Sequence, residues 1–155
     1  MSEPKPRLFT PLFFVMCGFT GTVFLSAFLI LPTTPFRILQ LGGSKFAAGL
    51  FLGFLTYASA FSAPLTGALA DRVGKRRMLL VCSFAIAGLH TAYGIFQDYR
   101  FILGLAFVHG AFWSALLSAS AAYITDIVPE SRRAEGIGYW GLSTTIAIVV
   151  ALAIT

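Results

Sequence analysis

The stretch from Gly67 to Arg77 gathers side chains whose chemistry is electrostatic. It holds one carboxylate, Asp71, and four of the eleven lysine and arginine residues of the 155-residue chain. An apolar run ends here, and a carboxylate at the end of a helix faces the negative end of the helix dipole, so Asp71 needs positive partners. Gly67 lies one turn earlier on the same face and leaves room beside the carboxylate, while Gly74 permits a tight turn. The residues of this predicted ion-pair cluster are Gly67, Asp71, Arg72, Gly74, Lys75 and Arg76.

A second charged stretch covers residues 126–135. Pro129 ends any helix that precedes it, because proline lacks a backbone donor. We expect Asp126 to join the charge cluster of the first stretch, with Arg132 and Arg133 as further members of the network. The plain alternative is that both stretches are ordinary basic loops between membrane helices, with incidental acids.

His109 lies inside an apolar run and shares one helix face with Trp113 and Ser120. An ionisable side chain inside a membrane span is costly to bury, so it is a candidate for contact with a substrate. The alternative is a neutral histidine that is hydrogen bonded between helices. Tyr57 is a weaker candidate for the same cavity, and His90 is expected to be structural.

The sequence does not favour an enzyme, a metal site or a cofactor. Catalysis at membrane depth needs clustered reactive groups, and neither histidine has an acid or a paired nucleophile within one helical turn. Cys17 and Cys82 lie in apolar runs without other ligands at metal-binding spacing, so we expect two small core residues. No metal and no cofactor is predicted.

The composition indicates an all-α, polytopic membrane helix bundle. Hydrophobic residues make up 57% of the chain, charged residues only 11%, and the mean hydropathy is +0.85. The charges are clustered, which leaves uncharged runs of about twenty residues that suit a bilayer core of about 30 Å. The net charge of +5 resides in short turns beside apolar helices, so nucleic-acid binding is not expected.

Five membrane spans are predicted, at residues 8–31, 46–70, 78–96, 101–124 and 136–155. The first is expected to end at Pro32-Thr33-Thr34-Pro35, because two prolines remove backbone donors and disfavour helical backbone before them. Small residues recur along one face of the second span, which favours close approach of another helix. These small residues are Gly49, Gly53, Thr56, Ala60, Ala63, Gly67 and Ala70.

The distribution of cations predicts the orientation in the membrane. Eight lysine and arginine residues fall on the side of the N-terminus, and three on the opposite side. The positive-inside rule then places the N-terminus in the cytoplasm. Because the fifth span runs to Thr155, the chain is expected to be the first part of a longer protein. The alternative is a small, complete membrane subunit or assembly partner without transport activity of its own.

Two segments resemble signatures of the major facilitator superfamily of secondary transporters. The segment Gly67-Ala-Leu-Ala-Asp71-Arg72-Val-Gly74-Lys75-Arg76-Arg77 is similar to the loop signature between helices two and three of that family. The segment 126–136 resembles the signature before helix five, and two spans separate the segments, as in the family. The resemblance implies the first five helices of such a transporter, without its C-terminal half.

The resemblance also implies a function, which is the movement of a small solute across the lipid bilayer by alternating access. In the family the first loop is understood to latch the two halves together on the cytoplasmic side, and helix four lines the central cavity. We expect a bacterial inner membrane as the location. Ala106 stands where proton-coupled members often carry arginine, and Ala151-Leu152 stands where exporters often carry glycine-proline, so neither proton antiport nor drug efflux is favoured. Position 75 is lysine where arginine is commoner, and lysine lacks the two-pronged guanidinium.

Overall fold

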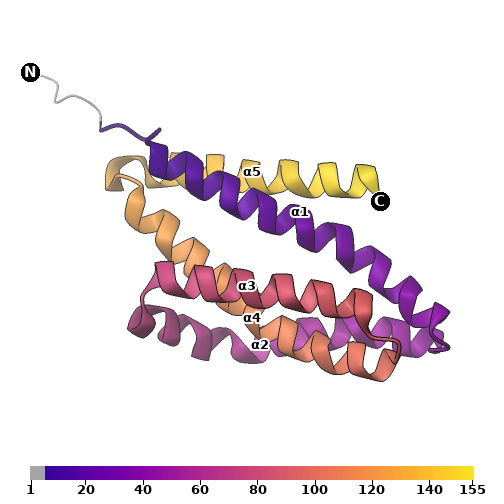
Figure 1. Cartoon of the computed structure of the whole chain (residues 1–155). Coiled ribbons are helices and arrows are strands. Elements are labelled where there is room, and N and C mark those ends of the chain that lie inside the picture. Colours follow the sequence, from indigo (N-terminus) through magenta and orange to yellow (C-terminus); the bar gives the residue numbers. More distant parts are fainter. Residues whose placement is uncertain (1–5) are drawn as a thin grey trace, which may run out of the picture.

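The computed structural model describes residues 6–155 as a bundle of five long helices. Figure 1 shows α1 (Pro11–Gln40) beside α5 (Arg133–Ile154), with α2 (Lys45–Val73), α3 (Lys75–Ile95) and α4 (Tyr99–Ile127) as a second group. A short 3-10 turn, η1 (Glu130–Arg132), precedes α5. Each of the five long helices is long and apolar enough to cross a membrane. The prediction of an all-α membrane helix bundle is confirmed.

Polar side chains fix the starts of three of these helices. Thr10 Oγ1 accepts a hydrogen bond from the amide of Phe13 at 3.2 Å, and Ser44 Oγ accepts one from Ala47 at 3.1 Å. Asp98 Oδ1 accepts one from the amide of Arg100 at 2.8 Å. Each bond satisfies a backbone donor that a helix start leaves without a partner, so the sequence defines these boundaries locally.

The prediction that Pro32 and Pro35 end the first helix is wrong. α1 continues through both prolines to Gln40. Thr33 Oγ1 donates to the carbonyls of Leu29 and Ile30 at 3.1 and 3.0 Å, and Thr34 Oγ1 donates to the carbonyl of Ile30 at 2.8 Å. Hydroxyls therefore supply bonds to the carbonyls beside those that the prolines leave free, and breaking the helix would expose more backbone than continuing it.

Helix ends at the charged stretches also differ from the prediction. α2 extends past Ala70 to Val73 and α3 begins at Lys75, so Gly74 alone separates them. Its φ of 96° lies in the left-handed region that glycine adopts without strain. Likewise, α4 includes Asp126 and α5 begins at Arg133. Most of the charged side chains thus project from rigid helix ends instead of loops.

α2 and α4 approach each other closely at Gly110. A Cβ atom at this position would collide with the carbonyl oxygen of Leu55 and would lie 2.8 Å from the Cβ of Ala58. The core beside this crossing holds Phe51 and Ile102, both fully buried. A single small residue on α4 therefore sets the approach of α2.

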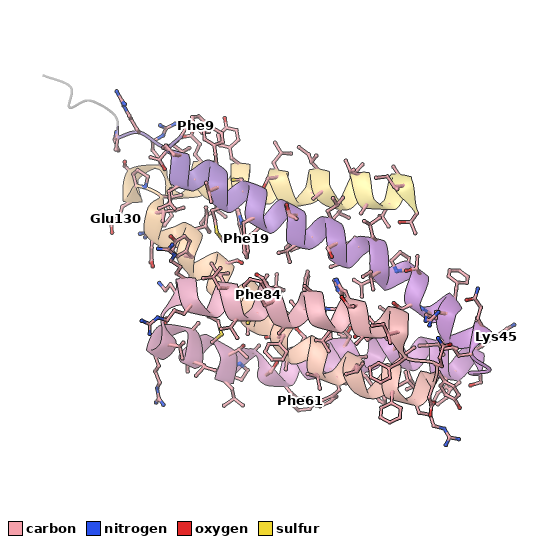
Figure 2. All side chains as sticks on the ribbon, viewed as in Figure 1. Phe9, Phe19, Lys45, Phe61, Phe84 and Glu130 are labelled. Carbon is pink, nitrogen blue, oxygen red and sulfur yellow. The ribbon has the colours of Figure 1, made fainter. Side chains whose placement is uncertain are left out.

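The predicted small-residue face of α2 does not serve this contact. No described atom lies within 4 Å of a Cβ built at Gly49, Gly53 or Gly67, and Ala70 is the one member of that face that is buried. The prediction that a helix packs closely on this face is not met within residues 6–155. Nearby rings are exposed as well, such as Phe61 at 76%, which projects from the edge of the bundle in Figure 2.

Candidate functional site

The charge cluster forms around Gly74, where α2 and α4 end and α3 begins. Lys75 Nζ lies 2.6 Å from Asp126 Oδ2, which joins the first turn of α3 to the last turn of α4. The lysine is three-quarters buried, while the aspartate is half exposed. Asp126 therefore meets the first charged stretch, through the lysine at position 75.

Asp71 is exposed in the last turn of α2 and forms no ion pair with any residue of the described part of the chain. The expected partner Lys75 bonds to Asp126 instead. At the carboxyl end of α2, the charge of Asp71 also opposes the helix dipole, which costs up to about 1 kcal/mol. A positively charged partner would therefore stabilise this carboxylate.

A hollow of about 600 Å³ surrounds these groups. Three cations of α3 line it together with one carboxylate from α2 and one from α4, so the site is basic on balance. Arg72 does not line it, and Gly67 leaves open space one turn behind Asp71. The lining residues are Ala70, Asp71, Val73, Gly74, Lys75, Arg76, Arg77, Tyr123 and Asp126.

Arg132 and Arg133 form local pairs at the start of α5. Arg132 donates two hydrogen bonds to the carboxylate of Glu135 at 2.8 and 2.7 Å, and a third to the carbonyl of Pro6 at 3.2 Å. Arg133 lies 3.7 Å from Glu130. These two arginines do not reach Asp126, so the predicted network divides into separate groups.

His109 is 1% exposed and lies between helices. Its Nδ1 is 3.1 Å from the hydroxyl of Tyr93 on α3, and its ring is 5.2 Å from that of His90. This is the hydrogen-bonded arrangement that the sequence left open as the alternative to substrate contact. Tyr93 was not singled out from the sequence, although His90 and Tyr93 share a face of α3 at a spacing of three residues.

Of the other predicted cavity residues, Trp113 lies beside His109, with ring centres 6.3 Å apart. Trp113 packs its ring 5.3 Å from that of Phe24 on α1. Ser120 is fully buried, and its hydroxyl has no partner within residues 6–155. Tyr57 is 66% exposed on the open side of α2. Contact of these side chains with a substrate stays a prediction.

A further cation was also missed at the sequence level. Arg37 lies beyond the two prolines of α1, where the sequence predicted a loop. Its Nε donates to the carbonyl of Tyr93 at 2.9 Å, and its Nη2 donates to those of Gly94 and Phe96 at 2.8 and 3.3 Å. These are carbonyls at the end of α3, where a cation also complements the helix dipole.

Known proteins similar to this chain are membrane transporters. Residues 13–155 match the family model of the Major Facilitator Superfamily. YncC of Bacillus subtilis, which bears the name of a metabolite transport protein, is 39% identical over 100 residues, covering 61% of this chain and 20% of the relative. The multidrug resistance protein MdtG of Salmonella choleraesuis is 30% identical over 127 residues, covering 79% of this chain and 30% of the relative. The chain thus spans less than a third of the length of either relative.

Proposed function

The chain belongs to the major facilitator superfamily, and from that premise we propose that it is the N-terminal part of a secondary active transporter that moves a small solute by alternating access. It is a multi-pass integral membrane protein of a transporter family. A transport site of this type lies between two repeats that rock against each other. We propose that a C-terminal half, following residue 155, supplies the other wall of that site.

The observation that carries this proposal is that Asp71 forms no ion pair within residues 6–155. Its charge opposes the dipole of α2, and Lys75 bonds to Asp126. A helix N-terminus or a cation from the second half would relieve that cost and close the cytoplasmic side. Breaking this contact would let the two halves separate, so Asp71 would act as one side of a latch.

The exposed face of α2 supports a partner at this position. Gly49, Gly53 and Gly67 have open space beside them, and small residues allow a second helix to approach closely in lipid. Tyr57 lies near the middle of the same helix and is largely exposed. We propose that this face meets the second half and that Tyr57 borders the solute path, with His109, Trp113 and Ser120 as weaker candidates.

The proposed orientation in the membrane rests on the distribution of charge, and the proposed location rests on the relatives. The end of the bundle at Gly74 carries most of the cations, so we propose that this end and the N-terminus are cytoplasmic. The relatives from Bacillus and Salmonella are bacterial, which supports a bacterial inner membrane. No enzymatic role is proposed, because the family is one of transporters.

Transport by an Asp71→Asn variant of the intact protein tests the latch. A panel of radiolabelled sugars, amino acids and organic acids, with fluorescent cations, first identifies a solute that the protein moves. We expect Asp71→Asn to lower the transport rate of that solute far more than the amount of protein in the membrane. The matched control is Glu130→Gln, which removes an exposed carboxylate at the same end of the bundle. Equal rates for wild type and Asp71→Asn would contradict the proposal.

A further inference from the structure

A groove of about 340 Å³ lies between α2 and α3, in the half of these helices nearest Gly74. Figure 1 shows the two helices running side by side from the turn that joins them. They contact each other little, because both pack mainly on α4, which also lines the groove. The residues that line this α2–α3 groove are Thr66 and Leu69 of α2, Met78 and Cys82 of α3, and Phe107, Val108, Ala111, Phe112 and Ala115 of α4.

The lining of the α2–α3 groove is hydrocarbon almost throughout. The hydroxyl of Thr66 donates to the carbonyl of Ala63 at 3.2 Å and lies 3.3 Å from the hydroxyl of Ser114, so its polar atom is already engaged. The thiol of Cys82 behaves as a small apolar group. The volume is near the lower end of the range of small-ligand sites, about 300–1,000 Å³. An apolar occupant therefore fits this groove, and a polar solute does not.

The α2–α3 groove is open at the surface of the described bundle and reaches its core. Leu69, Phe107 and Val108 are about half exposed, whereas Met78 and Cys82 are buried. In a bilayer, such an opening between membrane-spanning helices meets the acyl chains of the surrounding lipid.

Two arginines without an ion pair lie close to the same groove. Leu69 and Met78 are each about one helical turn from Gly74, which corresponds to roughly 6–8 Å along a helix. Arg72 belongs to the last turn of α2 and Arg77 to the first turn of α3. Both side chains are exposed, and neither forms an ion pair within residues 6–155.

The charges around Gly74 favour an anion at this end of the groove. The cations outnumber the carboxylates by four to two, and one of the two carboxylates, Asp126, is paired with Lys75. The cations of α3 also lie at the positive end of its helix dipole, where a negative charge is stabilised. The six charged residues are Arg72, Lys75, Arg76 and Arg77, with Asp71 and Asp126.

We propose that the α2–α3 groove binds one acyl chain of an anionic phospholipid, whose phosphate lies between Arg72 and Arg77. A phospholipid joins an anion to a hydrocarbon chain, and this part of the bundle places cations about one helical turn beyond a hydrocarbon groove. Arginine side chains on membrane helices extend along apolar surface towards the headgroups, and cations at the ends of such helices attract anionic lipids. The inference concerns the bilayer and does not depend on the movement of a solute.

Native mass spectrometry of the intact protein tests the lipid class. Phosphatidylglycerol and phosphatidylcholine with identical chains are added to the delipidated protein, and a dissociation constant is obtained for each. We expect phosphatidylglycerol to bind about tenfold more tightly, because phosphatidylcholine carries a compensating cation. Equal dissociation constants for the two lipids would overturn the proposal.

Arginine variants test the position of the phosphate. Arg72→Gln and Arg77→Gln should each weaken the binding of phosphatidylglycerol by about fivefold. The matched control is Arg76→Gln, which removes the same charge from the same turn but from a side chain that lines a different groove, between α1 and α3. An equal loss in the Arg76 variant would show attraction by net charge alone and would contradict the site.

Filling the α2–α3 groove tests the position of the acyl chain. Ala111→Phe places a ring among the lining residues and should abolish the preference for phosphatidylglycerol, whereas Val81→Phe, at an exposed position of α3 outside the lining, should retain it. Glycerophosphoglycerol, which has the headgroup without chains, provides a test that needs no variant, and we expect it not to compete with the lipid. Unchanged binding by Ala111→Phe, or competition by the headgroup alone, would refute the role of the groove.

Photocrosslinking locates the bound lipid in the membrane. Phosphatidylglycerol with a diazirine on one chain is incorporated into nanodiscs with the intact protein, and the modified peptides are identified after illumination. We expect attachment to the lining residues of α2, α3 and α4. Attachment only elsewhere would contradict the proposal, as would no attachment because a segment that follows residue 155 covers the groove.

Discussion

Lys75 is the residue on which the charge cluster around Gly74 depends in this conformation. It bonds to Asp126 across the α3–α4 contact, and Asp71 consequently has no ion pair within the described chain. The pair is partly exposed, and ion pairs of this kind contribute at most about 1 kcal/mol to stability. Its importance would therefore appear in transport more than in folding.

Exchanging the charges of Lys75 and Asp126 distinguishes an effect on transport from an effect on folding stability. We expect Lys75→Glu and Asp126→Lys to lower transport each on its own, because each places two like charges together. The double variant restores opposite charges and should recover most of the activity. Thermal unfolding of the purified single variants should change by less than about 1 kcal/mol in the free energy of unfolding. Failure of the double variant to recover would show that the contact itself is not needed.

The sequence indicated that Asp71, Lys75 and Asp126 lie in one cluster, but it did not indicate their pairing, and it included Arg132 and Arg133, which form local pairs instead. The spacing of Gly67, Asp71 and Gly74 indicated a tight turn with an acid at the end of a helix. Lys75 pairs with Asp126 because of the way α4 packs against the start of α3. Local sequence patterns do not encode this packing. The hydrogen-bond partner of His109 could not be predicted for the same reason, because Tyr93 lies on another helix.

At the level of the helices, Gly110 sets the distance between α2 and α4. Gly110→Ala should destabilise the protein by about 1–3 kcal/mol, since the added methyl group meets the backbone of Leu55 and cannot be accommodated without moving a helix. Gly104→Ala on the same helix is the control, because no described atom lies within 4 Å of its Cβ. That control should be neutral or stabilising by up to about 1 kcal/mol. Equal melting temperatures for the two variants would contradict this packing.

Arg37 connects the extended end of α1 to the end of α3 by hydrogen bonds. Arg37→Gln loses charged hydrogen bonds to three carbonyls and should destabilise the protein by about 1–3 kcal/mol. Lys45→Gln removes an exposed cation near the same end of the bundle and should change stability by less than about 0.5 kcal/mol. Thermal unfolding in detergent compares the two, and a larger loss for the lysine variant would contradict the role given to Arg37.

The existence and order of the five helices could be predicted from hydropathy alone, whereas their ends could not. Pro32 and Pro35 stop helices in water, where exposed backbone groups bond to solvent. In a bilayer, continuing the helix costs less free energy than ending it, because only the threonine hydroxyls and the helix itself can bond to the backbone carbonyls. With lipid as the solvent, continuation of α1 through both prolines is therefore favoured.

For the whole molecule, the open face of α2 is the feature that the transport account must explain. Its small residues have no helix against them within residues 6–155, although such faces normally serve helix packing in membranes. Under the proposed transport mechanism, this face lies at the boundary between two moving halves. A residue on it should then meet water from each side of the membrane in turn.

Labelling of a cysteine at position 57 tests that claim most directly and needs no knowledge of the solute. Tyr57→Cys is introduced into the intact protein after replacement of Cys17 and Cys82, and a membrane-impermeant maleimide is added from one side or the other. We predict labelling from both sides, with Asp71→Asn increasing the share from the side of Gly74. Labelling from neither side, or a share that Asp71→Asn leaves unchanged, would contradict alternating access controlled by this latch.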